Sequence, residues 1–184
     1  MKSLLVAAAF ACSLSPVYAD EISDTLQSAL DAYTDGDVAY ALEELEYARQ
    51  QMMALKQDAL TQFLPEAPEG YTREVNTEMN AGLALMGGGY GAEASYIAES
   101  GDSFTIQLLA DNPMIAGLGA LISNAAAYGA KIERVGRQKF MVQDGEAQAL
   151  MNGRILIKAE GGDMATMLAL LETIDYGALG AFGN

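Results

Sequence analysis

The change in apolar spacing along this chain of 184 residues constrains its fold more than any other feature. Up to residue 62, apolar residues recur every three or four positions, which predicts helices. Two prolines and a glycine then lie between Leu64 and Tyr71 and cannot continue a helix. Beyond them, apolar residues alternate with polar ones, as in strands with one buried face. We therefore expect a helical part, a Pro/Gly linker at 64–71 and a second part that contains a sheet.

The helical part is expected to be an antiparallel hairpin over residues 20–63. Asp35-Gly36-Asp37 separates two apolar stripes, and the second stripe predicts one amphipathic helix from about Val38 to Gln62. The hairpin resembles one tetratricopeptide unit, but stacked repeats of this kind need about three units to be stable. We therefore expect the hairpin to pack on the rest of the protein. The stripes comprise Leu26, Ala29, Leu30 and Tyr33, then Val38, Ala41, Leu42, Leu45, Ala48, Met52, Leu55 and Ala59.

Residues 72–184 are expected to form an α+β domain. Alternating residues predict a hairpin of strands 92–98 and 104–110. The dipeptides Asp144-Gly145 and Asn152-Gly153 suit two-residue turns and predict a three-stranded antiparallel meander. Helices are expected from Asn112 to about Ala130 and from Asp163 to Gly177. The order strand, strand, helix, three strands, helix predicts an antiparallel sheet with helices packed on it.

The meander poses a question of register. With two-residue turns, Phe140 would pair with Ala149, and Ala149 with Leu156. That register would put Ile155 and Ile157 on the same face as the cations of the first meander strand. Either that face is covered, for instance by the helical hairpin, or a bulge shifts one strand.

Residues 1–19 have the pattern of a signal peptide. Lys2 is followed by the apolar run Leu4 to Cys12, and the small-x-small ending predicts cleavage after Ala19. Lipidation at Cys12 is disfavoured because the apolar run before it is very short. The exported chain would contain no Cys, His or Trp, which excludes disulfides, thiol or histidine catalysis, and zinc sites of the usual ligands. We expect a periplasmic protein with no cofactor and no catalytic residue.

The charge distribution excludes one class of partner. The chain has 25 acidic and 10 basic residues, and 18 of the acids but only three bases lie between Asp20 and Asp111. Such a chain repels phosphate backbones, so nucleic acid is not an expected partner. One cluster of acidic residues offers oxygen ligands for calcium, but the chain has no EF-hand pattern. We therefore favour a solvated helix end for this cluster, which comprises Asp35, Asp37, Glu43 and Glu44.

Three segments are candidates for binding. The stretch 112–130 has no charged residue, so it is expected to be a helix buried between sheet and hairpin or, alternatively, a contact for lipid, ligand or partner. The glycine-rich run 86–91 lacks the Lys-Ser/Thr ending of a P-loop and is expected to be a loop or lid. Two cations of the first meander strand complete the set. The candidate interaction surface comprises Met114, Leu118, Arg137, Lys139, Gly88 and Tyr90.

Several short motifs resemble a family of exported proteobacterial proteins that has no assigned activity. They are Leu64-Pro65-Glu66, Gly70-Tyr71-Thr72-Arg73-Glu74, Gly87-Gly88-Gly89, Ala110-Asp111-Asn112, Arg137-Gln138-Lys139 and Asn152-Gly153-Arg154. The resemblance implies a periplasmic location and carries over no site. In outline, the second part is also similar to PsbP-like domains, a helix-flanked antiparallel sheet, which implies nothing about function.

These observations together favour a non-catalytic periplasmic module that binds a protein partner or the membrane surface. The alternative is a carrier that holds a small hydrophobic ligand or lipid between sheet and helices, since such sites are mostly apolar and concave.

Overall fold

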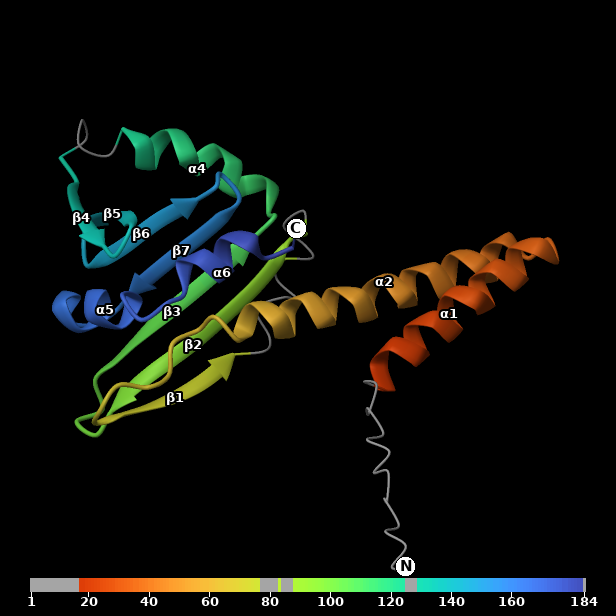
Figure 1. Ribbon diagram of the computed structural model, residues 1–184, viewed down its shortest axis with the longest axis horizontal. Helices are drawn as coiled ribbons and strands as arrows, with labels where there is room; N and C mark the ends of the chain where they lie inside the picture. The colour runs from red at the N-terminus through yellow and green to blue at the C-terminus, as the bar shows by residue number, and fades with distance from the viewer. Residues whose placement is uncertain (1–16, 77–82, 84–87, 125–128, 184) are drawn as a thin grey trace, which may run out of the picture. The chain divides into compact units, whose positions relative to one another are not determined.

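The structure is a computed structural model that describes residues 17–76, 83, 88–124 and 129–183. Figure 1 shows two N-terminal helices followed by a sheet with helices between strands and at the C-terminus, so the predicted α+β class is confirmed. The chain divides into two compact units, residues 1–52 and 53–184. The elements are α1 Val17–Thr34, α2 Val38–Thr61, β1 Tyr71–Asn76, β2 Tyr90–Ala98, β3 Ser103–Ala110, α4 Pro113–Ser123, β4 Lys131–Val135, β5 Gln138–Gln143, β6 Glu146–Met151, β7 Ile155–Glu160, α5 Met164–Leu171 and α6 Tyr176–Ala181.

The predicted signal peptide falls mostly on residues that the structure leaves undescribed. Residues 1–16 lie outside the described part, and Val17 to Ala19 belong to α1. Export and cleavage after Ala19 therefore stay predictions from the sequence.

The turn between α1 and α2 follows from its three residues. Gly36 has a φ of +87°, a region that glycine adopts without strain. The Asp37 amide donates to the Ala32 carbonyl at 2.9 Å, which satisfies a carbonyl at the end of α1. The Asp37 carboxylate accepts from the Tyr40 amide at 3.1 Å and caps α2. The chain thus reverses direction, and Figure 1 shows the two helices side by side as the predicted hairpin.

Small side chains line the contact between α1 and α2. Three alanines of the predicted stripes, Ala29, Ala41 and Ala48, are buried, and so is Ala32, whereas Ala59 of the second stripe is exposed. The larger residues of the same stripes remain exposed. The stripes therefore divide into a buried alanine seam and an outer set of Leu, Val, Tyr and Met side chains.

The second unit is built on one seven-stranded sheet with the order β1-β2-β3-β7-β6-β5-β4, in which every pairing is antiparallel. The pairing of β3 with β7 joins the predicted hairpin to the predicted meander. The two edge strands, β1 and β4, are absent from the sequence prediction. Both are short and rich in exposed polar side chains, as edge strands often are, so their apolar alternation is weak.

The register question is settled by a bulge. Met141 pairs with Gln148 across the two-residue turn, as predicted. Ala149, however, pairs with Ile157, so the predicted pairing with Leu156 is wrong by one residue. The Asn152-Gly153 turn is closed by the Arg154 amide, which donates to the Met151 carbonyl at 3.1 Å, and Arg154 remains as an extra residue before β7. Ile155 and Ile157 consequently lie on the buried face.

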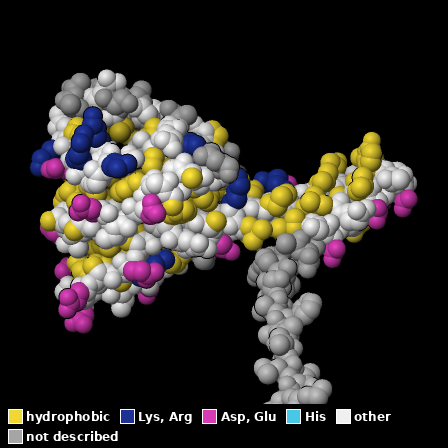
Figure 2. Space-filling model, in the orientation of Figure 1, with side chains coloured by type: hydrophobic (Ala, Val, Ile, Leu, Met, Phe, Trp, Pro, Cys, Tyr) yellow, Lys and Arg dark blue, Asp and Glu magenta, His cyan; other side chains and the backbone are white. Residues whose placement is uncertain are grey.

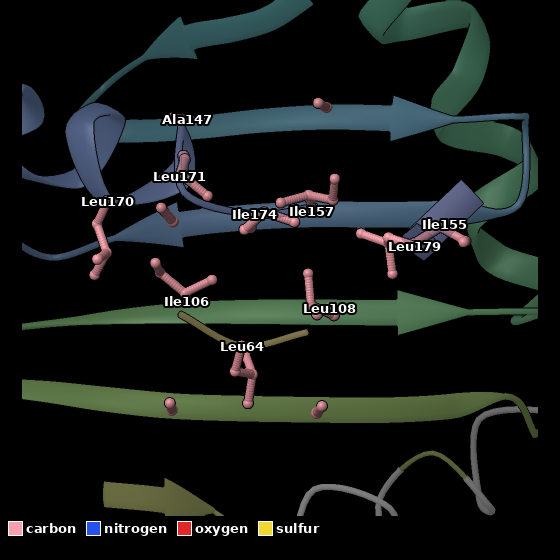
Figure 3. Close-up of a cluster of buried hydrophobic side chains, with 14 of the residues drawn as sticks. Leu64, Ile106, Leu108, Ala147, Ile155, Ile157, Leu170, Leu171, Ile174 and Leu179 are labelled. Carbon is pink, nitrogen blue, oxygen red and sulfur yellow. The ribbon is translucent and has the colours of Figure 1, made fainter. Parts of the chain in front are cut away.

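That face carries the hydrophobic core of the second unit. Figure 3 shows side chains of β3, β6 and β7 gathered with those of α5, α6 and the segment that follows α2. Each large aliphatic side chain buried in this way contributes roughly 1.5–3 kcal/mol to stability. The labelled members are Leu64, Ile106, Leu108, Ala147, Ile155, Ile157, Leu170, Leu171, Ile174 and Leu179.

A buried tyrosine fixes the Pro/Gly segment to the sheet. The Tyr96 hydroxyl donates to the Pro65 carbonyl at 2.7 Å, and the Tyr96 ring stacks on Phe104 with centroids 4.9 Å apart. The side chain is fully buried, and this burial raises the pKa of Tyr96 to about 12. The predicted linker 64–71 therefore packs against the core through at least one side-chain contact.

The C-terminal helix of the prediction is two helices in the structure. Asp163 caps α5 by accepting from the Thr166 amide at 2.8 Å, and this hydrogen bond lowers the pKa of the Asp163 carboxyl. The prediction of one continuous helix to Gly177 is wrong because Asp175 starts a second one. Its carboxylate accepts from the amides of Gly177 and Ala178, both at 3.0 Å. Aspartate forms such caps more readily than it continues a helix.

Candidate interaction surface

Most of the exposed large hydrophobic side chains in the described part of the chain lie on α1 and α2. Figure 2 shows hydrophobic side chains gathered along these helices. Nine of them belong to the first unit, each with between 40% and 67% of its surface exposed, and all but Tyr40 and Tyr47 form one set of seven. We call this set the hairpin apolar face: Leu26, Leu30, Tyr33, Val38, Leu42, Leu45 and Met52.

The phase of the two helices places these side chains on one side of the hairpin. On α1, Leu30 and Tyr33 each follow a buried alanine by one position, and Leu42 does the same on α2. One position is a rotation of about 100° about the helix axis. In an antiparallel pair, the same rotation about both axes leads to the same side. The other four lie one position after the buried Thr25, or three before or four after a buried alanine, which turns them toward the same side, so the seven residues form one continuous surface.

The other side of the hairpin carries carboxylates. Asp24 precedes the buried Thr25 by one position, and Asp31 precedes Ala32 in the same way. They line one hollow together with Asp35 and, from α2, Tyr40, which precedes Ala41. Residues one position before a buried residue therefore lie on one side of the hairpin. Residues one position after a buried residue lie on the opposite side. The hairpin has one apolar and one acidic face.

The described carboxylates of the hairpin do not gather as metal ligands would. Within residues 17–76, 83, 88–124 and 129–183, no group of three Asp, Glu, Cys or His side chains is arranged to hold a metal ion. The acidic cluster considered for calcium at Asp35, Asp37, Glu43 and Glu44 is part of that range. The same described residues contain no helix with the length and apolar character needed to cross a membrane.

Three residues of the predicted surface meet near Asn112. Its side-chain amide donates to the Gly88 carbonyl at 2.6 Å, and its side-chain oxygen accepts from the Met114 amide at 2.9 Å. Tyr90 begins β2 beside Ala110, and the Lys56 ammonium lies 4.8 Å from its ring centroid. Met114 is 60% exposed, so it is the apolar side chain that this cluster offers to solvent.

The helix that carries Met114 and Leu118 is only partly buried within its own unit. Ile115 is buried and Leu118 half-buried, whereas Gly117 is exposed. A Cβ at Gly119 would lie 3.0 Å from Leu150, so α4 packs closely on β6. One side of α4 covers the sheet and the other is open. Residues 125–128 of the predicted helix and Met86-Gly87 of the glycine run lie outside the described residues.

Arg137 and Lys139 lie elsewhere, on the β4–β5 hairpin. The residues around Asn112 lie next to β3. Two strands, β7 and β6, separate β3 from β5. Lys139 pairs with Arg134 across the hairpin, and all three of these cations are exposed. Figure 2 shows Lys and Arg side chains gathered there. The structure therefore divides the predicted surface into an apolar and a basic part, and the larger hairpin apolar face was not among the predicted residues.

The sequence contained the signal for the hairpin apolar face. The stripes over residues 26–59 predict ordinary helix packing, which the burial of Ala29, Ala41 and Ala48 confirms and the exposure of the larger residues does not. Helical spacing marks the side of a helix that is apolar, but it does not show how much of that side the neighbouring helix covers.

The face of the sheet opposite the core carries polar side chains that bond to one another. The positions Asn76, Glu93 and Gln107 are aligned across three strands, with hydrogen bonds of 2.8 Å and 2.5 Å. Lys158 continues the row and forms ion pairs with Glu160 at 2.9 Å and Glu146 at 3.4 Å. Because these groups satisfy one another, the row is a structural feature of the sheet.

An apolar groove lies in the second unit, between the segment after α2 and α5. Its volume is about 750 Å³. Apolar side chains line most of it, with Thr166, Thr173 and Asp175 among the polar residues. The apolar lining comprises Phe63, Leu64, Pro65, Ala67, Pro68, Ala169, Leu170 and Ile174.

Neither protein-family models nor curated proteins nor solved structures match this chain. The outline similarity to PsbP-like domains therefore has no support among solved structures.

Proposed function

We propose that this protein is a non-catalytic periplasmic interaction module and that the hairpin apolar face is its docking surface. The exposure of seven large hydrophobic side chains on one side of two helices carries the proposal. Contiguous apolar patches of this kind on soluble proteins usually mark interaction sites. The periplasmic part of the proposal comes from the signal-peptide pattern of residues 1–19.

The packing of the hairpin supports a role in binding. Its two helices contact one another through alanines, which bury little apolar area, and they leave the larger side chains available. Helices draw most of their stability from packing an apolar face. A partner seated on this face would therefore stabilise the hairpin as it binds.

A photo-crosslinking residue at position 42 tests this proposal in cells. Leu42 lies on the hairpin apolar face, and Tyr47, on the opposite side of α2, supplies the matched control. The two side chains are 62% and 50% exposed, so solvent access does not separate them. We expect protein adducts at position 42 in clear excess over position 47. Equal yields at the two positions, or none at position 42, would contradict the proposal.

The groove favours a second function, the carrier of a small hydrophobic ligand. Its apolar lining and its volume of about 750 Å³ lie within the range typical of ligand sites. The space between the sheet and helices α5 and α6, by contrast, holds packed core side chains. Native mass spectrometry should then show a retained small molecule that Ala169→Phe releases. A wild-type mass equal to that of the bare chain would argue against a carrier.

A further inference from the structure

We infer that the partner seated on the hairpin apolar face is a second copy of this chain, so that two hairpins form a four-helix bundle. The inference rests on the proposed function, because it names the partner of that docking surface. Three observations support it: the size of the face, the placement of charge around it, and the lack of a matching patch on the rest of the described chain.

The size of the face suits a dimer. Seven large side chains that are each roughly half exposed present on the order of 700 Å² per hairpin, against roughly 800 Å² per partner in a standard interface. The face is formed by two antiparallel helices, so two copies related by a twofold axis would place the same residues opposite one another. The product has the arrangement of a four-helix bundle with the larger side chains inside.

The charges allow two copies to approach. Between Asp20 and Met52 the chain has nine acidic residues and one basic residue, so two hairpins would repel if their carboxylates met. Three of the nine, Asp24, Asp31 and Asp35, lie on the side away from the apolar face. In the bundle these carboxylates point outward into solvent, where salt screens them over about 10 Å.

The second unit of the same chain does not offer an equivalent apolar patch. In its described residues, the exposed large hydrophobics are one each on α2, β1, α4 and β4: Leu55, Val75, Met114 and Ile132. Scattered single residues of this kind do not make a complementary surface. A second hairpin apolar face does, since it has the same area and apolar character.

The test uses the protein in the form that accumulates in cells. Sedimentation measures its mass in solution from about 1 to 100 μM, a range that covers moderate dimer affinities. We expect a dimer whose dissociation constant rises at least tenfold in Leu42→Glu and in Leu30→Glu. Tyr47→Glu adds the same charge on the other side of the hairpin and should leave the dimer intact. A wild-type monomer throughout, or equal weakening by Tyr47→Glu, would overturn the inference.

Two tagged copies in one cell separate this inference from the proposed function. Photo-crosslinking at position 42 should join the two tags in an adduct of twice the chain mass, and this readout needs no destabilising substitution. Adducts only with a different protein would overturn the second copy as partner and leave the interaction module standing. Absence of any adduct at position 42 would overturn both.

Discussion

Arg154 and Asp111 form a bidentate ion pair in which Nε lies 2.8 Å from Oδ1 and Nη2 lies 2.8 Å from Oδ2. Arg154 is the extra residue after the Asn152-Gly153 turn, and Asp111 follows β3 with a φ of +57°. The Arg154 guanidinium also donates to the Phe182 carbonyl at 2.7 Å. One side chain thus links the end of β3, the β6–β7 turn and the residue after α6.

Arg154→Lys should lower stability because lysine cannot reproduce the two-pronged pairing. The side chains are 25% and 34% exposed, so we expect a loss of about 1 kcal/mol, which is below the range for a buried charged pair. Thermal unfolding followed by circular dichroism measures the loss. Arg49→Lys, in the more exposed pair with Glu46, is the control and should leave the melting temperature unchanged. Both pairs are bidentate, so equal effects of the two substitutions would show that the partial burial of the Arg154–Asp111 pair adds nothing.

The stabilisation from Asp111 should depend on pH. The hydrogen bond from Arg154 holds the pKa of the Asp111 carboxyl below its ordinary value of 3.8. A lowered folded-state pKa means that the stabilisation is complete above that ordinary value and is lost as the pH falls further, through the folded-state pKa. The difference in unfolding free energy between the wild type and Asp111→Asn should therefore be constant from neutral pH to about pH 5 and shrink below about pH 4. Urea unfolding across this range checks it, and a difference that grows in acid would refute the assignment.

Tyr96→Phe should cost about 1–2 kcal/mol, because it leaves the Pro65 carbonyl without the hydroxyl donor seen at 2.7 Å. The ring itself is retained, so the stacking on Phe104 should persist. Urea denaturation at neutral pH gives the free energy of unfolding. Tyr33→Phe, at a 67% exposed position, is the matched control and should unfold like the wild type. A Tyr96→Phe protein as stable as that control would show that the hydrogen bond contributes nothing.

Gly89→Ala should destabilise the protein more than Gly88→Ala. Both glycines have positive φ, +104° and +91°, so each substitution introduces backbone strain of about 1–2 kcal/mol. Only at Gly89 would the new Cβ also lie 2.9 Å from the Ala110 carbonyl oxygen and from Asn112. That overlap should add about 1–3 kcal/mol. Equal melting temperatures of the two variants would show that the close approach at Gly89 is relaxed at little cost.

The sequence by itself determined the elements whose signals are local. Asp35-Gly36-Asp37 ends one helix and caps the next, and Asp144-Gly145 makes a two-residue turn, because these residues satisfy the backbone within a few positions. Alternation over β2, β3 and the meander likewise identified the strands, since one face of each is buried by the same core.

Only the tertiary structure decided the rest. Each edge strand, β1 or β4, pairs with one neighbour only and is open to solvent along its other edge. Its alternation of apolar and polar residues, which would predict a strand from the sequence, is therefore weak. The register of β7 depends on Arg154, whose partner Asp111 lies 43 residues earlier in the chain. In the hairpin, the spacing predicted the apolar side of each helix, but only the approach of α1 to α2 decided that alanines would be buried and leucines exposed. Local patterns set which way a side chain points, and distant residues set what it meets.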